Sequence, residues 1–517
     1  MLKNLKNIVV VSLSTVGSRV LGLVRDILIF AALGASAWND AFILAFTLPN
    51  LFRRLLGEGA LTSAMVPIFS DVLQRAGRSE AFAFFNQVLL RLLLILSALV
   101  VSGMIVFGSL AQSGLLSDRW ALGAELAVVV LPYMIFICLA AIISAGLNLL
   151  GRFAVAASTP MLLNLAMIAA LVAGMWLSDD QARIVYWLCG GVLVGGLLQL
   201  LLPAWDLARQ GWRPRVEKRA STEMSELWLL FLPGLMGAAI LQVNILVSRL
   251  LAYSLDESAV SVLYLASRLM ELPLGIFTVA VATVFFPLLA RAVSDNDDHA
   301  FAGALTQGMR LVVGISLPAG VGLVILGEPI LELFRWGAFS TQNAAQTIPL
   351  IAIYGIGLPF YSAATFATRG LHACKDMKTP VRVAGLCLLV NLISGLVLMQ
   401  FYGASGLAAG NVLAAIVQSA CLWRALSKHR SEVGFSHLRG AFAKVLCAGL
   451  GMGLFCFIGH ALVLSFDLAD KLNAAVIVGL FVPGGAALYF GLLYVLKFEE
   501  LDALAGMLRR FIPKRKA

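Results

Sequence analysis

Seven charged side chains lie within an apolar stretch of the chain, between Ser12 and Pro67. A charge at the centre of a bilayer costs about 2.5 to 3.5 kcal/mol, so seven facing lipid would cost on the order of 20 kcal/mol. That exceeds the roughly 5 to 15 kcal/mol net stability of a typical fold. We therefore expect these side chains to face water, a partner charge or a bound ligand in a cavity between helices. They are Arg19, Arg25, Asp26, Asp40, Arg53, Arg54 and Glu58.

Arginine predominates in this set, and its planar fork of donors suits phosphate and carboxylate groups better than the point charge of lysine does. Residues three or four apart on a helix share a face, so Arg54 could pair with Glu58. Arg19 and Asp26 are seven apart and nearly aligned, so they could also neutralise each other. Two arginines would then lack a local partner, which predicts a cavity with a positive excess that selects an anionic headgroup. These two are Arg25 and Arg53.

The second half of the chain carries fewer charges in its apolar segments. Arg268 and Glu271 are three apart, so they could form a local ion pair that lowers the cost of burial and does nothing more. The same alternative applies to Arg54 with Glu58. Prolines within the apolar segments would bend helices and can open space for a cavity. These prolines are Pro49, Pro67, Pro273, Pro287 and Pro359.

The composition is that of a membrane protein. The chain has 517 residues, of which 60% are hydrophobic and only 13% are charged, whereas soluble domains are about a quarter charged. This excludes a soluble enzyme. Apolar segments of roughly 20 residues or more recur along the whole chain and predict an all-α polytopic protein with about fourteen transmembrane helices. The seven cysteines and five histidines show no metal-ligand or disulfide spacing.

The basic residues fall in alternate loops. Lys3 and Lys6, the run from Arg209 to Arg219, Lys428 with Arg430, and the tail from Arg509 to Lys516 lie on one side of the predicted spans. The other side holds few: Arg119, Arg183, Arg335 and Lys471. The positive-inside rule therefore places both termini in the cytoplasm, and an even number of helices agrees. Orientation and contact with anionic lipid explain the net charge of +10 better than nucleic-acid binding does.

Sequence landmarks recur at an offset of about 220 residues, which is the pattern of an internal duplication. Val66 to Ser70 resembles Phe286 to Ala290, and Ser158 to Pro160 resembles Lys378 to Pro380. We expect two six-helix lobes in a parallel pseudo-repeat, at 1–208 and 222–427, joined by a basic cytoplasmic linker at 209–221. Two extra helices at 438–497 and a basic interfacial tail at 498–517 would follow.

Six short motifs lie at or near these charged residues: SRVLGLVRD at 18–26, NDAF at 39–42, LPNLFRR at 48–54, GEGA at 57–60, SRLMELP at 267–273 and DMKTP at 376–380. In these motifs the chain resembles a known family, the MurJ (MviN) lipid II flippases. The resemblance implies a fourteen-helix member of the multidrug/oligosaccharidyl-lipid/polysaccharide exporter superfamily, whose two extra helices form a groove for the undecaprenyl tail.

The resemblance also assigns roles to single residues. Four arginines match positions that hold the diphosphate of the substrate: Arg19, Arg25, Arg53 and Arg268. Asp26, Asp40 and Glu271 match acidic positions that matter for transport, and Glu58 with Arg369 matches a gate between the lobes.

A sodium site of some family members is altered here. Asn391 is retained, but Ser248, Gly395 and Asn411 replace the two expected aspartates and a threonine. A hard cation needs several oxygen ligands including carboxylates. Sodium coupling at this place is therefore disfavoured, and membrane potential or another ion gradient is the expected drive. We expect no cofactor.

The function expected from the sequence is transfer of lipid II from the cytoplasmic to the periplasmic leaflet of the bacterial inner membrane, by alternating access through a cationic cavity. Membrane lipids and cell-wall synthesis enzymes are the other expected partners. Two alternatives stay open: an exporter of another polyprenyl-linked glycan, and a membrane-embedded polyprenyl-phosphate transferase. The transferase would need a catalytic acid or metal cluster, and the acidic clusters Asp179-Asp180 and Asp295 with Asp297-Asp298 have no histidines nearby.

Overall fold

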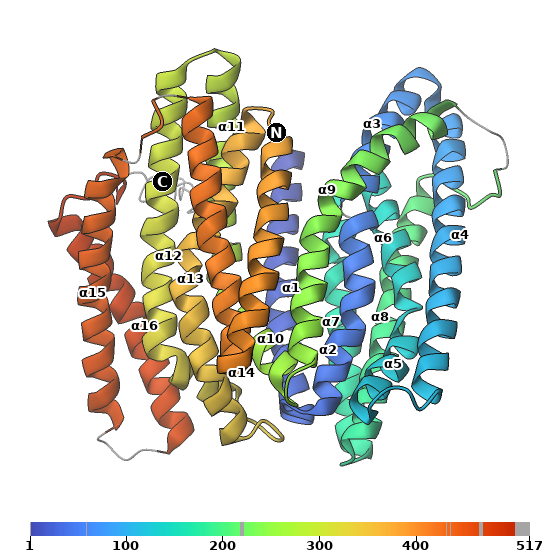
Figure 1. The fold of residues 1–517 in the computed structure, drawn as a ribbon. Coiled ribbons are helices and arrows are strands. Elements are labelled where there is room, and N and C mark those ends of the chain that lie inside the picture. The colour runs from blue at the N-terminus through green and yellow to red at the C-terminus, as the bar shows by residue number, and fades with distance from the viewer. Residues whose placement is uncertain are drawn as a thin grey trace. The chain divides into compact units, whose positions relative to one another are not determined.

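The computed structural model describes residues 2–57, 59–217, 222–430, 432–434, 436–464 and 469–501, and every regular element in these ranges is a helix (Figure 1). Helices satisfy their backbone hydrogen bonds internally, which apolar surroundings require. Ten of the described helices are long and apolar enough to cross a membrane, or up to eleven if a bent pair counts as one span. The predicted all-helical polytopic class is confirmed at this level.

The chain divides into two compact units. Unit 1 comprises Met1–Ser261 together with the short segment Trp336–Ser340. Its elements are α1 (Leu2–Leu33), α2 (Ala37–Phe52), the π-helical turn η1 (Arg53–Gly57), α3 (Ala60–Arg75), α4 (Gly77–Gln112), α5 (Asp118–Val130), α6 (Tyr133–Leu149), α7 (Phe153–Leu177), α8 (Gln181–Arg209), α9 (Thr222–Tyr253) and the first residues of α10 (Ala259–Pro273).

Unit 2 comprises Val262–Arg335 and Thr341–Ala517. It holds the rest of α10, η2 (Leu274–Thr278), α11 (Val279–Ser294), α12 (Asp298–Phe334), α13 (Thr341–Ala373), α14 (Lys378–His429), α15 (Ser436–Leu464) and α16 (Asp470–Val495). Most of the basic tail predicted at 498–517 lies outside the described residues.

Two of the long helices are interrupted by a π-helical turn. In unit 1, η1 follows Pro49 and separates α2 from α3. In unit 2, η2 follows Pro273 directly and separates α10 from α11. Proline lacks the N–H that a regular helix needs, so the hydrogen-bond ladder changes register near it. A π-helical turn, a form that is frequent at functional sites, therefore follows each of these two prolines.

Helix α14 changes direction at Gly403, whose backbone is not helical (φ 54°, ψ −130°). The first half of α14 then packs against the second half through small residues. A Cβ added to Gly410 would lie 3.0 Å from the backbone nitrogen of Gly395. Gly395, one of the positions where a carboxylate was expected for sodium, thus lies where the two halves approach closely.

Small residues also bring α7 and α8 together in unit 1. A Cβ on Gly191 would lie 2.6 Å from the Cβ of Ala170, and one on Gly195 would lie 3.0 Å from the Cα of Leu163. Close approach of this kind is how helices associate without a hydrophobic driving force. Packing is therefore the role of these glycines in the structure.

The last two helices are fastened to α12 within unit 2. The Tyr489 hydroxyl of α16 donates to the Gly314 carbonyl of α12 at 2.6 Å. In the first half of α12, Arg310 pairs with Glu500, which follows α16, at 2.8 Å, and at the end of α12 Arg335 pairs with Asp470 at the start of α16 at 2.8 Å. Helix α16 is therefore held to α12 by polar contacts at its start, within the helix and just after its end.

Candidate functional site

Arg25 lies at the centre of a buried polar network in unit 1. Its guanidinium donates to the Asp26 carboxylate at 2.6 Å and to the Asn164 side-chain oxygen of α7 at 3.0 Å. Asn164 in turn donates to the Ser18 carbonyl at 3.1 Å. Arg25 is 8% exposed and Asp26 is 1% exposed. A buried guanidinium with this many charge-assisted hydrogen bonds is held in one orientation.

This network adds a pairing that the spacing did not predict. Asp26 pairs with Arg25, the residue next to it, whereas helical spacing suggested Arg19 as a partner. Consecutive residues do not face each other on a helix, but the long arginine side chain folds back far enough to reach. Arg19 is exposed, and it lies three residues before Gly22, which is the first buried residue among the positions of α1 whose side chains are described. Helical spacing did not single out Asn164, because the partner of this polar residue lies on another helix.

Arg53 and Arg54 open the π-helical turn η1. Arg53 is half-buried and Arg54 is exposed, so the turn directs the two guanidiniums to different surroundings. Their expected neighbour Glu58 lies outside the described residues. Its ion pair with Arg54 and its gate with Arg369 therefore stay predictions, and Arg369 itself is exposed on α13.

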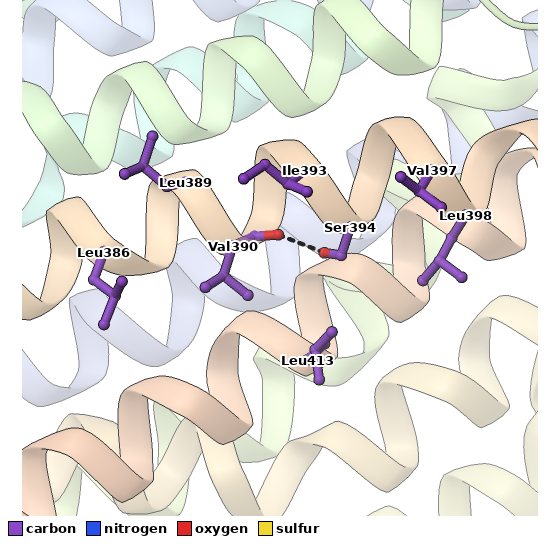
Figure 2. A pocket seen from close by; sticks show the side chains of 8 residues that line it. All are labelled: Leu386, Leu389, Val390, Ile393, Ser394, Val397, Leu398 and Leu413. Atoms are coloured by element: carbon purple, nitrogen blue, oxygen red, sulfur yellow. Dashed lines mark hydrogen bonds between the residues drawn. The ribbon is translucent and has the colours of Figure 1, made fainter.

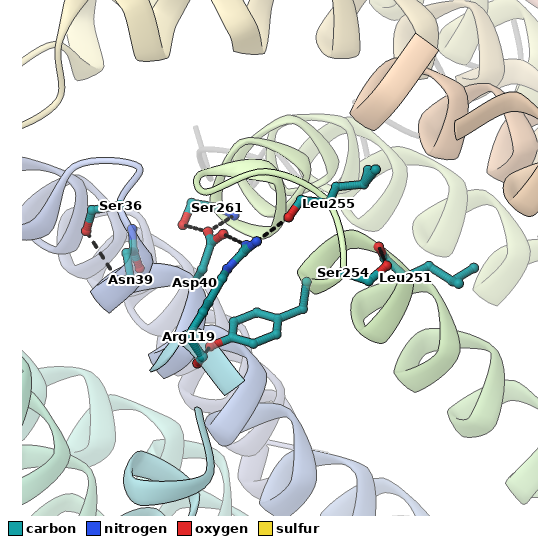
Figure 3. Close-up of polar contacts among 9 residues, drawn as sticks. Ser36, Asn39, Asp40, Arg119, Leu251, Ser254, Leu255 and Ser261 are labelled. Carbon is teal, nitrogen blue, oxygen red and sulfur yellow. Dashed lines mark hydrogen bonds and ion pairs between the residues drawn. The ribbon is translucent and has the colours of Figure 1, made fainter. Parts of the chain in front are cut away.

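Asp40 lies at the start of α2 and is fully buried. Figure 3 shows its carboxylate between two partners. One oxygen accepts from the Ser261 backbone N–H at 2.8 Å and from the Ser261 hydroxyl at 2.5 Å. The other accepts from Arg119 of α5 at 2.8 Å. From the sequence, Arg119 counted only as a loop charge in the positive-inside rule. Its pairing with Asp40 could not be predicted from helical spacing, because the two residues are 79 positions apart.

In unit 2, Arg268 and Glu271 form the local pair that their spacing allowed, with 3.3 Å between nitrogen and oxygen. Both side chains are partly exposed, at 35% and 51%. At the sodium positions, the retained Asn391 is buried, and the side-chain amide of Asn411, one of the replacing residues, donates to the Leu407 carbonyl at 3.2 Å. No carboxylate therefore stands at any of the four sodium positions named from the sequence, which are Ser248, Asn391, Gly395 and Asn411.

The four predicted substrate arginines are thus found in different settings. Arg25 is buried and hydrogen-bonded in unit 1, Arg53 lies in a π-helical turn, Arg19 is exposed, and Arg268 is paired in unit 2. Their convergence on one cavity stays a prediction.

An apolar pocket of about 600 Å³ lies on α14 in unit 2 (Figure 2). Its lining side chains are aliphatic except for Ser394, whose hydroxyl donates to the Val390 carbonyl at 2.6 Å and so turns away from any ligand. Such a lining accepts hydrocarbon and offers nothing to a phosphate. It is not a headgroup site.

The chain is similar to a set of membrane proteins over almost its whole length. It matches the family described as Lipid II flippase MurJ over residues 29–476. It is 32% identical over 523 residues to the Probable lipid II flippase MurJ of Bdellovibrio bacteriovorus, covering 97% of this chain and 96% of that protein. It is 31% identical over 506 residues to the Lipid II flippase MurJ of Burkholderia cenocepacia, covering 94% and 96%.

Solved structures give the same result. One described as Lipid II flippase MurJ, inward closed conformation, superposes with a TM-score of 0.78 at 26% identity, covering 96% of this chain and all of that one. An inward-facing multidrug resistance MATE family transporter has a TM-score of 0.68 at 14% identity, covering 80% and 95%, and shares the fold. On the match over residues 29–476 and these relatives, the chain belongs to the lipid II flippase MurJ family.

Proposed function

We propose that this protein moves lipid II, the lipid-linked peptidoglycan precursor, from the cytoplasmic to the periplasmic leaflet by alternating access. The observation that carries the proposal is the family match over residues 29–476. The activity answers a physical need, because a charged sugar diphosphate cannot cross hydrocarbon unaided. The protein would offer the headgroup fixed polar contacts while the polyprenyl tail stays in lipid.

Four arginines would bind the diphosphate: Arg19, Arg25, Arg53 and Arg268. The Arg25 network supports a specific step for one of them. Asp26 holds the guanidinium at 2.6 Å, and a diphosphate oxygen is an acceptor of the same kind. Arg25 would therefore exchange Asp26 for the substrate, and the freed carboxylate would drive release by taking the guanidinium back.

Other acidic residues would act in the conformational cycle. Asp40 and Glu271 both sit in ion pairs that can break and reform, with Arg119 and with Arg268. Glu58 with Arg369 would form the gate between lobes. The drive would be the membrane potential, worth about 2.3 kcal/mol per charge per 100 mV, or an ion gradient acting elsewhere than at the neutral sodium positions.

The topology we propose has fourteen crossings in the bacterial inner membrane, with both termini cytoplasmic. A straight helix of the length of α14, 52 residues, would be about 78 Å long, far more than the roughly 30 Å hydrocarbon core. Its break at Gly403 therefore supports two crossings. The two-lobe repeat is supported by the interrupted helices, since α2–η1–α3 returns as α10–η2–α11 about 220 residues later.

The test is transfer of purified lipid II between the leaflets of liposomes holding the purified protein. Arg25→Ala removes charge-assisted hydrogen bonds worth about 1.5 to 3 kcal/mol, so we expect transfer to fall roughly tenfold to a hundredfold. Arg291→Ala is the matched control, because its side chain is 84% exposed, and it should transfer like the parent. Transfer by the Arg25 variant at the parent rate would refute the binding role.

The same liposomes separate the alternatives. A polyprenyl-phosphate transferase would change the headgroup chemically, whereas a flippase returns intact lipid II from the other leaflet. An exporter of another polyprenyl-linked glycan would transfer that glycan and leave lipid II in place. Intact lipid II arriving in the second leaflet, with no new product, is the outcome we expect.

A further inference from the structure

Arg119, in the first turn of α5, makes more contacts than an orienting loop charge needs. Its guanidinium donates to Asp40 at 2.8 Å and also to the Leu255 carbonyl of the α9–α10 connection. The same guanidinium lies 4.5 Å from the ring centroid of Tyr253, at the end of α9. The Tyr253 hydroxyl donates to the Arg119 carbonyl. Figure 3 shows the side chain between these groups.

The packing around Tyr253 holds this arrangement in place. Trp120 meets its ring edge-on, with 4.8 Å between centroids. A Cβ on Gly123 would lie 3.0 Å from the Tyr253 oxygen, so α5 approaches α9 only because Gly123 has no side chain. Tyr253 is fully buried as a result. The first turn of α5 thus fixes both the end of α9 and the connection that follows it.

This cluster lies at the point where the chain passes from unit 1 to unit 2. Asp40 binds the backbone and the hydroxyl of Ser261, and Ser261 is the last residue of unit 1 before α10 continues in unit 2. The guanidinium of Arg119 therefore bonds the same carboxylate that holds the point where the chain leaves unit 1. The same guanidinium also donates to the carbonyl of Leu255, which lies in the α9–α10 connection, four residues before α10 begins.

We propose that Arg119 is a positioning residue for transport: it clamps Asp40 and the α9–α10 connection together, and the clamp must open for α10 to move. The inference rests on the proposed function only in naming lipid II as the cargo. Asp40 supplies the acceptor, but a carboxylate alone cannot bond the Leu255 carbonyl. The bidentate fork of Arg119 joins these two acceptors, and lysine, a single ammonium point, would do so poorly.

The test measures opening of the clamp directly. Val260 lies beside Ser261 and is 2% exposed, so a Val260→Cys reporter should react slowly with a membrane-impermeant maleimide. Arg119→Gln should raise the labelling rate roughly tenfold, the equivalent of about 1.4 kcal/mol in the opening equilibrium. Arg119→Lys should fall between the two. Arg183→Gln is the matched control, since that side chain is 75% exposed on the same predicted side.

A double-mutant cycle distinguishes a clamp from general loosening. If Arg119 acts through Asp40, Arg119→Gln combined with Asp40→Asn should label no faster than the faster single variant. Additive effects, or labelling of Arg119→Gln at the rate of Arg183→Gln, would overturn the proposal. Labelling does not depend on cargo. A parent protein that fails to move lipid II while Arg119→Gln still opens the clamp would therefore refute the proposed function and leave the clamp standing.

Discussion

The ion pair of Arg25 with Asp26 is a costly arrangement for stability alone. Both groups are buried, and replacing a buried ion pair by apolar residues of similar size is often neutral or stabilising. Removing one partner, in contrast, leaves a buried charge that is expensive. A pair of this kind fits a site where a ligand of matching charge replaces one partner.

Asp376, in the turn between α13 and α14, shows a different use of a carboxylate. One of its oxygens accepts from the backbone N–H groups of Lys378 and Thr379, at 3.1 and 2.9 Å, and so caps α14. The other lies 2.8 Å from the His429 ring at the far end of the same helix. Desolvation raises the pKa of Asp376, but hydrogen bonds from Thr379 and His429 outweigh it and hold the pKa well below its usual value.

The depressed pKa sets the sign of a pH effect. A carboxyl whose pKa is lower in the folded protein contributes its stability above the unfolded value, near 4, and loses it as the pH falls through the folded value. Asp376→Asn should therefore lower the free energy of unfolding by about 1 to 2 kcal/mol at pH 7, and by the same amount at pH 5. Thermal melting in detergent at several pH values measures this difference.

The control for this variant is Asp295→Asn. The Asp295 side chain is 63% exposed and lies 3.7 Å from Arg291, so its loss should change stability by less than about 0.5 kcal/mol. The difference between Asp376→Asn and the parent should shrink below pH 4. A difference that stays constant down to the lowest pH at which the parent is folded would contradict the role of the ionised carboxylate.

At the scale of elements, α14 offers a comparison of two glycines in one helix. Gly403 has a positive φ, which a residue with a Cβ adopts at a cost of about 1 to 3 kcal/mol. Gly385 is helical, and a Cβ at either position would contact nothing within 4 Å. Gly403→Ala should therefore lower the free energy of unfolding by that amount. Gly385→Ala should raise it by about 0.5 to 1 kcal/mol. Unfolding midpoints in denaturant measure both, and a shift of the same sign in the two variants would refute the backbone explanation.

The helices themselves could be predicted from sequence because an apolar chain has few other ways to satisfy its backbone. The interruptions were less accessible. Pro49 and Pro273 predicted bends, but no residue pattern indicated that the break would take the form of η1 and η2. Gly403 was not singled out at all, since a glycine in a glycine-rich chain carries no signal until its φ is known.

At the scale of the whole molecule, the charged residues were found by type but their partners were not. Asp40 pairs with Arg119 and with Ser261, which are 79 and 221 residues away. Helical spacing describes only contacts three or four residues apart within one helix, so it identified the pair of Arg268 with Glu271 and missed the pair of Arg25 with Asp26. Partners on other helices depend on packing, which no single-chain period encodes.

The order in which the helices cross the membrane is a property of the whole molecule. The number of crossings within α14 is the part of this order that is easiest to test. Two crossings within α14 require the bend at Gly403 to lie on the periplasmic side when both termini are cytoplasmic. Tyr402, next to the bend, is 68% exposed. Aromatic residues are enriched at the membrane–water boundary, so position 402 should lie there. A Tyr402→Cys variant should therefore react with a membrane-impermeant maleimide in intact spheroplasts.

The matched reporter is Met377→Cys, in the turn before α14, where the side chain is 57% exposed. It should react only after permeabilisation, because one crossing separates it from Tyr402. The parent, whose Cys447 is exposed, supplies the background for both. Labelling of both reporters under the same condition would mean that the first half of α14 does not cross. The count of fourteen and the cytoplasmic placement of both termini would then fail together, since the orientation of each later helix depends on that crossing.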